Sequence, residues 1–218
     1  MPLRPPPTRE PAPLDASCRR PWAASVASLA LIVAGLAMVA LHVVQPELDP
    51  IEEPVSFYVH ARGGGLLTVA LAAFGVAAIA LSSAKSRAPS TRSLAWGLAL
   101  FGSGMVLAAA VPSDEWFPWE EKPSLAGLIH AGAAVVAPPL LLVPMYRLGG
   151  DTGRGLPVRR RMLVLSIIYL LALLGSAVSL SVGFLRDEAP PAIGLAERAL
   201  AFSGFWWLWS LARTSART

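Results

Sequence analysis

Apolar residues in this chain come in six long runs that are separated by short polar segments. Each run approaches the roughly 20 residues that cross the hydrocarbon core of a bilayer at 1.5 Å per residue. The pattern predicts an all-α integral membrane bundle of six transmembrane helices, over residues 22–44, 63–83, 93–111, 124–146, 162–185 and 193–211. Ser124 stands just before the fourth run, where a serine marks the start of a helix.

The start of the second helix is open between two alternatives. Pro54 suits the first turn of a helix, and in a helix beginning there Ser56 and His60 would share one face. The three glycines at 63–65 then either lie inside one helix over 54–83 that is longer than the bilayer, or break it.

Composition agrees with a membrane protein. Hydrophobic residues make up 55% of the 218 residues and charged residues 15%, against about 25% charged in a typical soluble domain. The net charge of +4 does not indicate nucleic acid, because the basic residues lie between apolar runs, where membrane topology accounts for them. Residues 1–20 are rich in Pro and Arg and predict a disordered cytoplasmic tail. Residues 21–213 then form the transmembrane domain, and 214–218 form a second cytoplasmic tail.

The distribution of Lys and Arg orients the helices. With the N-terminus in the cytoplasm, the inner segments hold 14 of the 18 basic residues: Arg4, Arg9, Arg19, Arg20, Lys85, Arg87, Arg92, Arg147, Arg154, Arg159, Arg160, Arg161, Arg213 and Arg217. The outer segments hold three, namely Arg62, Lys122 and Arg186. Because an excess of Lys and Arg marks the cytoplasmic side, both termini are expected inside a bacterial inner (plasma) membrane.

Tryptophans near both predicted boundaries fit the aromatic belt of a membrane protein. Trp116 and Trp119 lie near the outer boundary, and the inner one holds Trp206, Trp207 and Trp209. We expect these side chains to anchor the protein in the lipid interface.

Polar residues gather toward the outer face of the predicted bundle. His130 and Glu197 each lie six residues, or about 9 Å, inside their helices. His42 lies one turn inside the outer end of the first helix, Asp114 follows the third, and Ser56 and His60 precede the second. Arg198 neighbours Glu197, and adjacent helical residues point about 100° apart, so the two need different partners. Ionisable groups inside a membrane usually mark a function or a pairing.

Four short motifs resemble the bacterial and archaeal membrane family called domain of unknown function 998. They are Pro54-Val55-Ser56, Val111-Pro112-Ser113-Asp114, Leu125-Ala126-Gly127-Leu128-Ile129-His130 and Gly194-Leu195-Ala196-Glu197-Arg198, in an order that covers about residues 22–212. The resemblance implies a multi-pass membrane protein and supports Ser56, Asp114, His130, Glu197 and Arg198 as site residues. It implies no reaction.

Three functions remain open at this point, and the sequence does not decide whether the protein is an enzyme. In a metal-dependent hydrolase of a lipid or amide, His42, His60 and His130 would bind zinc, and Ser56, Asp114 and His130 would be catalytic. This set resembles the alkaline ceramidase and adiponectin receptor superfamily, but the HxxxH pair and the seventh helix are missing. A proton-coupled carrier would use His130, Glu197 and Arg198. A non-enzymatic component would bind a small molecule or lipid in the same outer pocket, with membrane lipid as its surroundings.

Overall fold

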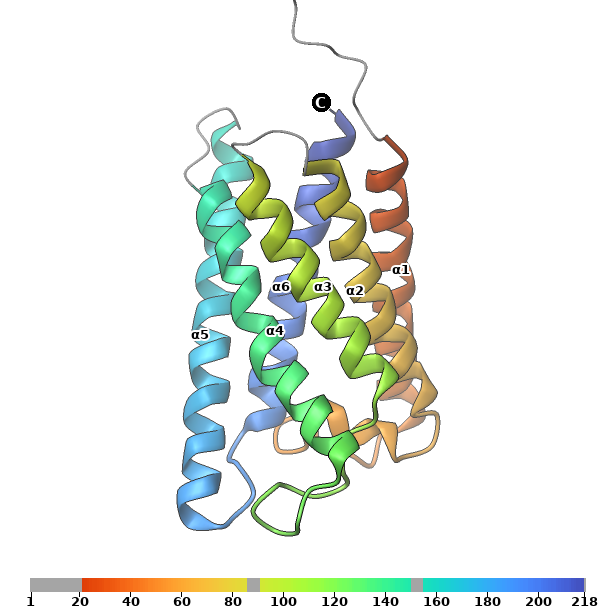
Figure 1. Ribbon diagram of the computed structural model, residues 1–218, viewed down its shortest axis with the longest axis vertical. Helices are drawn as coiled ribbons and strands as arrows, with labels where there is room; N and C mark the ends of the chain where they lie inside the picture. Colours follow the sequence, from red (N-terminus) through yellow and green to blue (C-terminus); the bar gives the residue numbers. More distant parts are fainter. Residues whose placement is uncertain (1–20, 86–90, 150–154, 218) are drawn as a thin grey trace, which may run out of the picture.

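The computed structural model describes residues 21–85, 91–149 and 155–217 and confirms the all-α fold. Six long helices run up and down in turn (Figure 1): α1 Pro21–Val44, α2 Gly65–Lys85, α3 Arg92–Ala110, α4 Leu125–Gly149, α5 Leu156–Arg186 and α6 Ile193–Arg217. A short 3-10 helix, η2, covers Val55–Val59. The start of α1 and the end of α6 lie at the same end of the bundle. The predicted tail over 1–20 lies outside the described residues.

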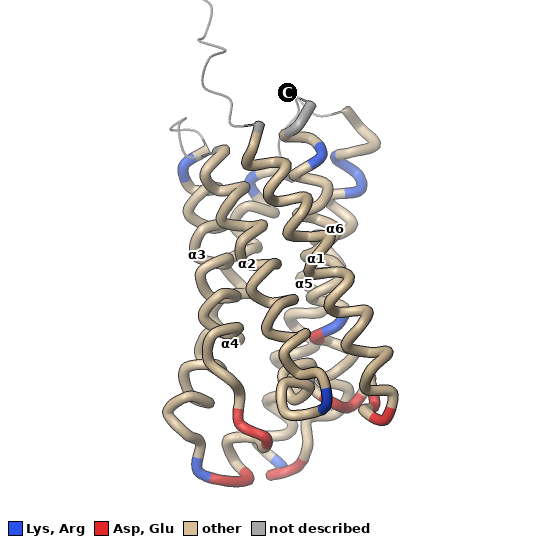
Figure 2. The backbone as a smooth tube through the Cα atoms, turned by 90° about the vertical axis from the view of Figure 1, so that its right-hand side faces the viewer, with Lys and Arg blue, Asp and Glu red and all other residues tan. Residues whose placement is uncertain are grey.

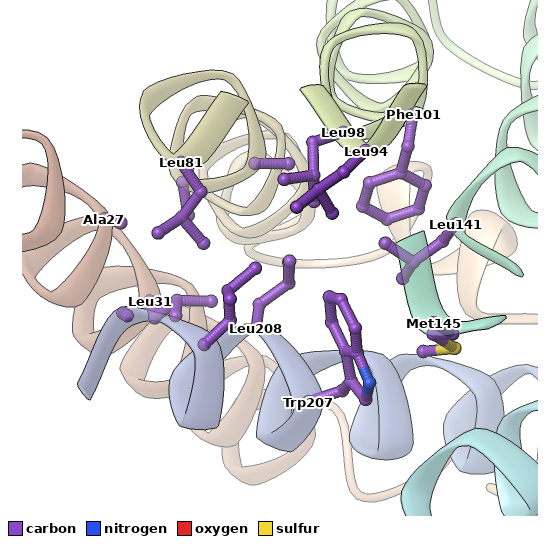
Figure 3. Packing of buried hydrophobic residues seen from close by; sticks show 14 of the residues in the cluster. Ala27, Leu31, Leu81, Leu94, Leu98, Phe101, Leu141, Met145, Trp207 and Leu208 are labelled. Carbon is purple, nitrogen blue, oxygen red and sulfur yellow. The ribbon is translucent and has the colours of Figure 1, made fainter. Parts of the chain in front are cut away.

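The helices form a ring in chain order, because each helix packs against the next and α1 packs against α6. Large buried side chains from five helices fill its centre (Figure 3): Leu31 of α1, Leu81 of α2, Phe101 of α3, Leu141 of α4, and Trp207 with Leu208 of α6. Apolar contacts with lipid are no worse than apolar contacts with protein, so shape complementarity rather than water exclusion must favour this packing.

Glycines bring α2 and α3 into close contact. A Cβ atom on Gly75 would lie 2.5 Å from the backbone oxygen of Gly102, and one on Gly102 would lie 2.6 Å from that of Gly75. Since real Cβ atoms stay beyond 3.0 Å, any larger residue at either position would push the two helices apart. Glycine at both positions therefore allows the two helices to approach closely.

Five helices, α1 to α5, are long and apolar enough to cross a membrane. Their outward-facing side chains include Leu36 and Leu171, which are 66% and 63% exposed, as expected where lipid is the solvent. Figure 2 shows Lys and Arg at the end that holds the chain termini and in a few places toward the opposite end, where Asp and Glu lie. We call that opposite end the far end; its connections are residues 45–64, 111–124 and 187–192.

Several helix boundaries differ from the predicted ones. The glycines break the second helix: Gly63 has φ +80°, and a Cβ on Gly64 would overlap with the backbone of Val59, so α2 begins only at Gly65. At the other end of the bundle, α5 begins at Leu156 instead of 162, because its first turns carry exposed arginines that an apolar run cannot reveal. The predicted tail from 214 is helical through Arg217.

The tryptophan prediction needs one correction. Trp207 is fully buried in the core rather than exposed to the lipid interface, whereas its neighbour Trp206 is 42% exposed. Adjacent helical residues point about 100° apart, so only one of the two can face outward.

Candidate functional site

Arg198 is the centre of a polar group that joins α6 to α1 and η2. Its Nε donates a hydrogen bond to Nε2 of His42 over 2.9 Å, and its Nη2 donates to the hydroxyl of Tyr58 over 2.7 Å. The guanidinium carbon also lies 5.1 Å from the centroid of the Tyr58 ring, in range of a cation–π interaction. We call Arg198, His42 and Tyr58 the Arg198 cluster.

Backbone oxygens complete the contacts of Arg198. Its Nη1 donates to the carbonyl oxygens of Glu53 at 3.0 Å and Gly194 at 2.9 Å. A side chain at Gly194 would overlap with the oxygen of Glu53 and lie 2.7 Å from Nη1 of Arg198. Glycine at this position therefore lets the 45–62 segment close over the start of α6.

The hydrogen bonds fix the protonation state of His42. Its Nδ1 lies 2.8 Å from the carbonyl oxygen of Met38, which can only accept, so Nδ1 carries the hydrogen. Its Nε2 faces a guanidinium N–H, which can only donate. His42 is therefore neutral here, with the lone pair of Nε2 directed at Arg198 and occupied by it.

Glu197, like Arg198, holds the 45–62 segment against the start of α6. Its Oε2 accepts a hydrogen bond from the backbone N–H of Val55 over 2.6 Å. Nearby, the N–H of Ala192 donates to Oε2 of Glu52 at 2.9 Å, and the N–H of Leu195 donates to the oxygen of Ile51 at 2.9 Å. Glu197 and Arg198 thus have different partners, as their adjacent positions on one helix predicted.

A second polar group lies in the segment between α3 and α4, and we call Asp114 and Ser124 the Asp114 cluster. Asp114 accepts hydrogen bonds from the hydroxyl and the backbone N–H of Ser124, over 2.6 and 3.0 Å. The Ser124 oxygen in turn accepts from the N–H of Gly127 at 2.9 Å. Ser124 is therefore the N-cap of α4, and its predicted role as a helix start is confirmed.

His130 is only 6% exposed and bonds to the end of the neighbouring helix. Its Nδ1 lies 3.0 Å from the carbonyl oxygen of Ala108 and 2.8 Å from that of Val111. The last carbonyls of a helix lack partners within it, so His130 supplies a donor to the end of α3. Its geometry is that of a structural hydrogen bond between helices.

Ser56 and His60 link η2 to the 111–124 segment. His60 lies 2.8 Å from the oxygen of Ser113 through Nε2 and 3.4 Å from a carboxylate oxygen of Glu115 through Nδ1. The Ser113 hydroxyl donates to the backbone oxygen of Ser56 at 3.1 Å. The two contacts of His60 lie at the surface of the far end, and the Ser113–Ser56 bond is half-buried.

The three histidines of the chain do not come together. His42 bonds to Arg198, His60 to the 111–124 segment and His130 to the end of α3. Over residues 21–85, 91–149 and 155–217, no three side chains of His, Cys, Asp or Glu are grouped so that they could hold a metal ion. The residues proposed as zinc ligands do not fit a zinc site in this arrangement, and we derive no metal-dependent step from them.

A cavity of about 600 Å³ lies between α1, α2 and α6. Arg198 and His42 are its polar lining residues, and the other walls are apolar, with Met38, Leu71, Phe74, Phe202, Phe205 and Trp206 among them. Its volume is within the usual range for ligand pockets. The sequence had pointed to Arg198 and His42, but it did not reveal the aromatic wall or Tyr58.

Comparison with known proteins gives a family and no relative of known activity. The sequence matches the family described as "Protein of unknown function (DUF998)" over residues 16–214. No curated protein and no solved structure matches the chain.

Proposed function

The chain belongs to the DUF998 family, and we propose that it is a six-span protein of the bacterial inner membrane that binds a ligand in an outer pocket around Arg198. In this proposal both termini are cytoplasmic and the far end faces outward. The protein binds its ligand and does not hydrolyse it.

The geometry of α6 supports a sixth span. The helix has 25 residues, or about 37 Å, which exceeds the roughly 30 Å of a bilayer core. It lies alongside the other helices (Figure 1) and packs against both α1 and α5. Its charged residues lower its hydropathy, but Arg198 and Glu197 are bonded within the protein. Intramembrane charges are tolerated in that position, where they face partners in the bundle.

The charge distribution supports the orientation. The end with the termini is basic and the far end is largely acidic (Figure 2), and Lys and Arg remain on the cytoplasmic side when a helix inserts. The Arg198 cluster and the opening of the cavity then belong to the outer half of the membrane.

The observation that carries the binding function is the position of Arg198. A permanently charged guanidinium lies on an otherwise apolar cavity, and the partners to which it bonds directly are neutral: an imidazole, a phenol and two carbonyls. Keeping a charge inside a membrane protein is costly, so such a residue usually serves a function. The residues proposed for hydrolysis do not come together, because His42 bonds to Arg198, Asp114 to Ser124 and His130 to the end of α3. The carrier's His130 is likewise tied to α3, so binding is the function that this geometry supports best.

Cysteine labelling in intact cells tests the topology. Cys18 is the single native cysteine, and we expect a membrane-impermeant maleimide to label it only after lysis. In a Cys18→Ser background, Glu121→Cys in the exposed 111–124 segment should be labelled in intact cells. Labelling of Cys18 from outside, or of Glu121→Cys only after lysis, would reject the orientation and with it the outer pocket.

A further inference from the structure

The cavity beside Arg198 opens sideways between α1 and α6. Three of its lining residues, Val39, Val43 and Phe202, are 65%, 73% and 62% exposed, so they form its rim. The rim is apolar and lies on the outer surface of two helices, where a membrane protein meets acyl chains. A molecule in the bilayer can therefore reach the cavity without passing through water.

The inner walls of the cavity suit a hydrocarbon chain. Met38 of α1, Leu71 and Phe74 of α2, and Phe205 of α6 line it. The α6 lining extends from Arg198 to Trp206, which is eight residues or about 12 Å along the helix axis. A chain bound along this wall would place its head at Arg198.

The polar end of the cavity suits an anion. Among the described residues, no carboxylate oxygen lies within 4.0 Å of the guanidinium nitrogens of Arg198. Glu197 is the nearest in sequence; its carboxylate bonds to the N–H of Val55 and attracts Arg198 through space, without a direct bond to the guanidinium. The four bonds of Arg198 use Nε, both Nη1 hydrogens and one Nη2 hydrogen, so one of its five N–H donors is left.

His42 is an acceptor that an anion can replace. An Arg–phosphate or Arg–carboxylate hydrogen bond is charge-assisted and about twice as strong as a bond between neutral groups. An anionic oxygen that accepts from Nε and the remaining Nη2 hydrogen would release Nε2 of His42. The two Nη1 bonds to Glu53 and Gly194 would stay in place and hold the guanidinium in position.

We propose that the cavity between α1, α2 and α6 binds a membrane lipid with an anionic headgroup, its acyl chain against the apolar wall and its headgroup on Arg198. This inference rests on the proposed outer pocket and specifies what occupies it. A soluble anion would leave the apolar wall and the lateral opening without a role, which is why we favour a lipid.

Native mass spectrometry of the detergent-purified chain tests the proposal. The probes are phosphatidylglycerol, which is anionic, and phosphatidylcholine, which is zwitterionic, with the same acyl chains. We expect one retained phosphatidylglycerol per chain and a preference of about tenfold or more over phosphatidylcholine, the size of one charge-assisted hydrogen bond. Arg198→Gln should abolish the preference, whereas Arg186→Gln, which removes an exposed charge at the far end, should keep it.

A second pair of variants tests the apolar wall without touching the charge. Ala201 is a half-buried lining residue, so Ala201→Phe fills the cavity and should prevent retention of either lipid. Ala177 lies exposed on α5, away from the cavity, and Ala177→Phe should bind like the unchanged protein. This pair keeps the test valid if Arg198→Gln fails to fold.

Three results would overturn the proposal. They are an unchanged lipid preference in folded Arg198→Gln, full lipid retention in Ala201→Phe, and displacement of phosphatidylglycerol by water-soluble glycerol phosphate at similar concentration. The last result would identify a soluble anion as the ligand. Because the measurement is made in detergent, it does not depend on membrane orientation, so a failure of the topology test and a failure of lipid binding can be told apart.

Discussion

Gly127 and Asp114 provide a sharp test of how α3 and α4 are joined. A Cβ atom on Gly127 would overlap with Oδ2 of Asp114 and lie 2.8 Å from Oδ1, and its three nearest atoms all belong to that carboxylate. Replacing Gly127 by Ala must therefore move Asp114 away from Ser124. Two hydrogen bonds to a charged group are lost, of 2.6 and 3.0 Å.

The expected change in the free energy of unfolding combines a loss of contacts with a gain in helix propensity. Loss of the exposed Asp114 contacts and of the oriented N-cap should destabilise the protein by about 2–3 kcal/mol. Alanine in a helix is favoured over glycine by about 0.5–1 kcal/mol, so Gly127→Ala should lower the free energy of unfolding by about 1–2.5 kcal/mol. In an Asp114→Ala background the overlap with the carboxylate is gone, and the same change should stabilise the protein by about 0.5–1 kcal/mol.

The assay is SDS titration of the purified variants in mixed micelles, with tryptophan fluorescence as the signal for unfolding. Gly132→Ala is the matched control, because Gly132 lies on the same helix and a Cβ there would meet nothing within 4 Å. We expect it to be neutral or slightly stabilising. If Gly127→Ala behaved like Gly132→Ala, or cost as much without the Asp114 carboxylate as with it, the described contact between α4 and the 111–124 segment would be wrong.

Three further substitutions test other parts of the structure. Gly102→Ala should separate α2 from α3 and lower the free energy of unfolding by about 1–3 kcal/mol, as overpacking does; SDS titration would show it, and an unchanged midpoint would contradict the close approach. His130→Ala should cost about 1–3 kcal/mol, because carbonyls at the end of α3 lose their donor, yet leave the phosphatidylglycerol preference intact. If folded His130→Ala lost the preference for phosphatidylglycerol, His130 would belong to the ligand site. Gly194→Ala should displace Glu53 and release the 45–62 segment, which faster trypsin cleavage after Arg62 would report; cleavage at the original rate would argue against the contact.

The long apolar runs predicted the helices because length and hydrophobicity are local properties of the chain. The position of Ser124 at a helix start was also readable, since capping depends on a few neighbouring residues. The glycines at 63–65 left two alternatives open, and the structure decides for a helix break. The prediction that Glu197 and Arg198 need different partners followed from helix geometry alone. Helix geometry did not predict which residues those partners are.

Contacts between distant segments could not be predicted in the same way. Arg198 meets His42 across 156 positions of sequence, and nothing in either local pattern specifies that pairing. Depth in the membrane predicted a shared site for His130 and Arg198, but depth does not give the direction in which a side chain points. The structure directs His130 to the end of α3 instead.

The sequence did indicate that Trp207 is buried, although the aromatic-belt rule predicted the lipid interface. Ser203 and Ser210 lie four residues before and three residues after it, and all three share one face of α6. Serines in membrane helices usually face other helices rather than lipid, so this face points inward. Ser203 is indeed 0% exposed and Ser210 6%, and Trp206, one position away, points toward the cavity rim.

The closure of the ring differs from its other contacts in a way that bears on function. Each of the helices α1 to α5 packs against the helix that follows it in sequence, and a connecting segment holds the two together. The α1–α6 contact is different, because it joins the first helix to the last; α6 also touches α2. A side-chain bond from Arg198 to His42 crosses the α1–α6 contact, beside the cavity that opens between the same two helices. A headgroup that replaces His42 as the acceptor would therefore exchange a bond between helices for a bond to ligand, at the place where no chain connection limits the separation of α1 and α6. In the proposed complex, ligand binding and the closure of the ring would be coupled, since both use the same N–H of Arg198.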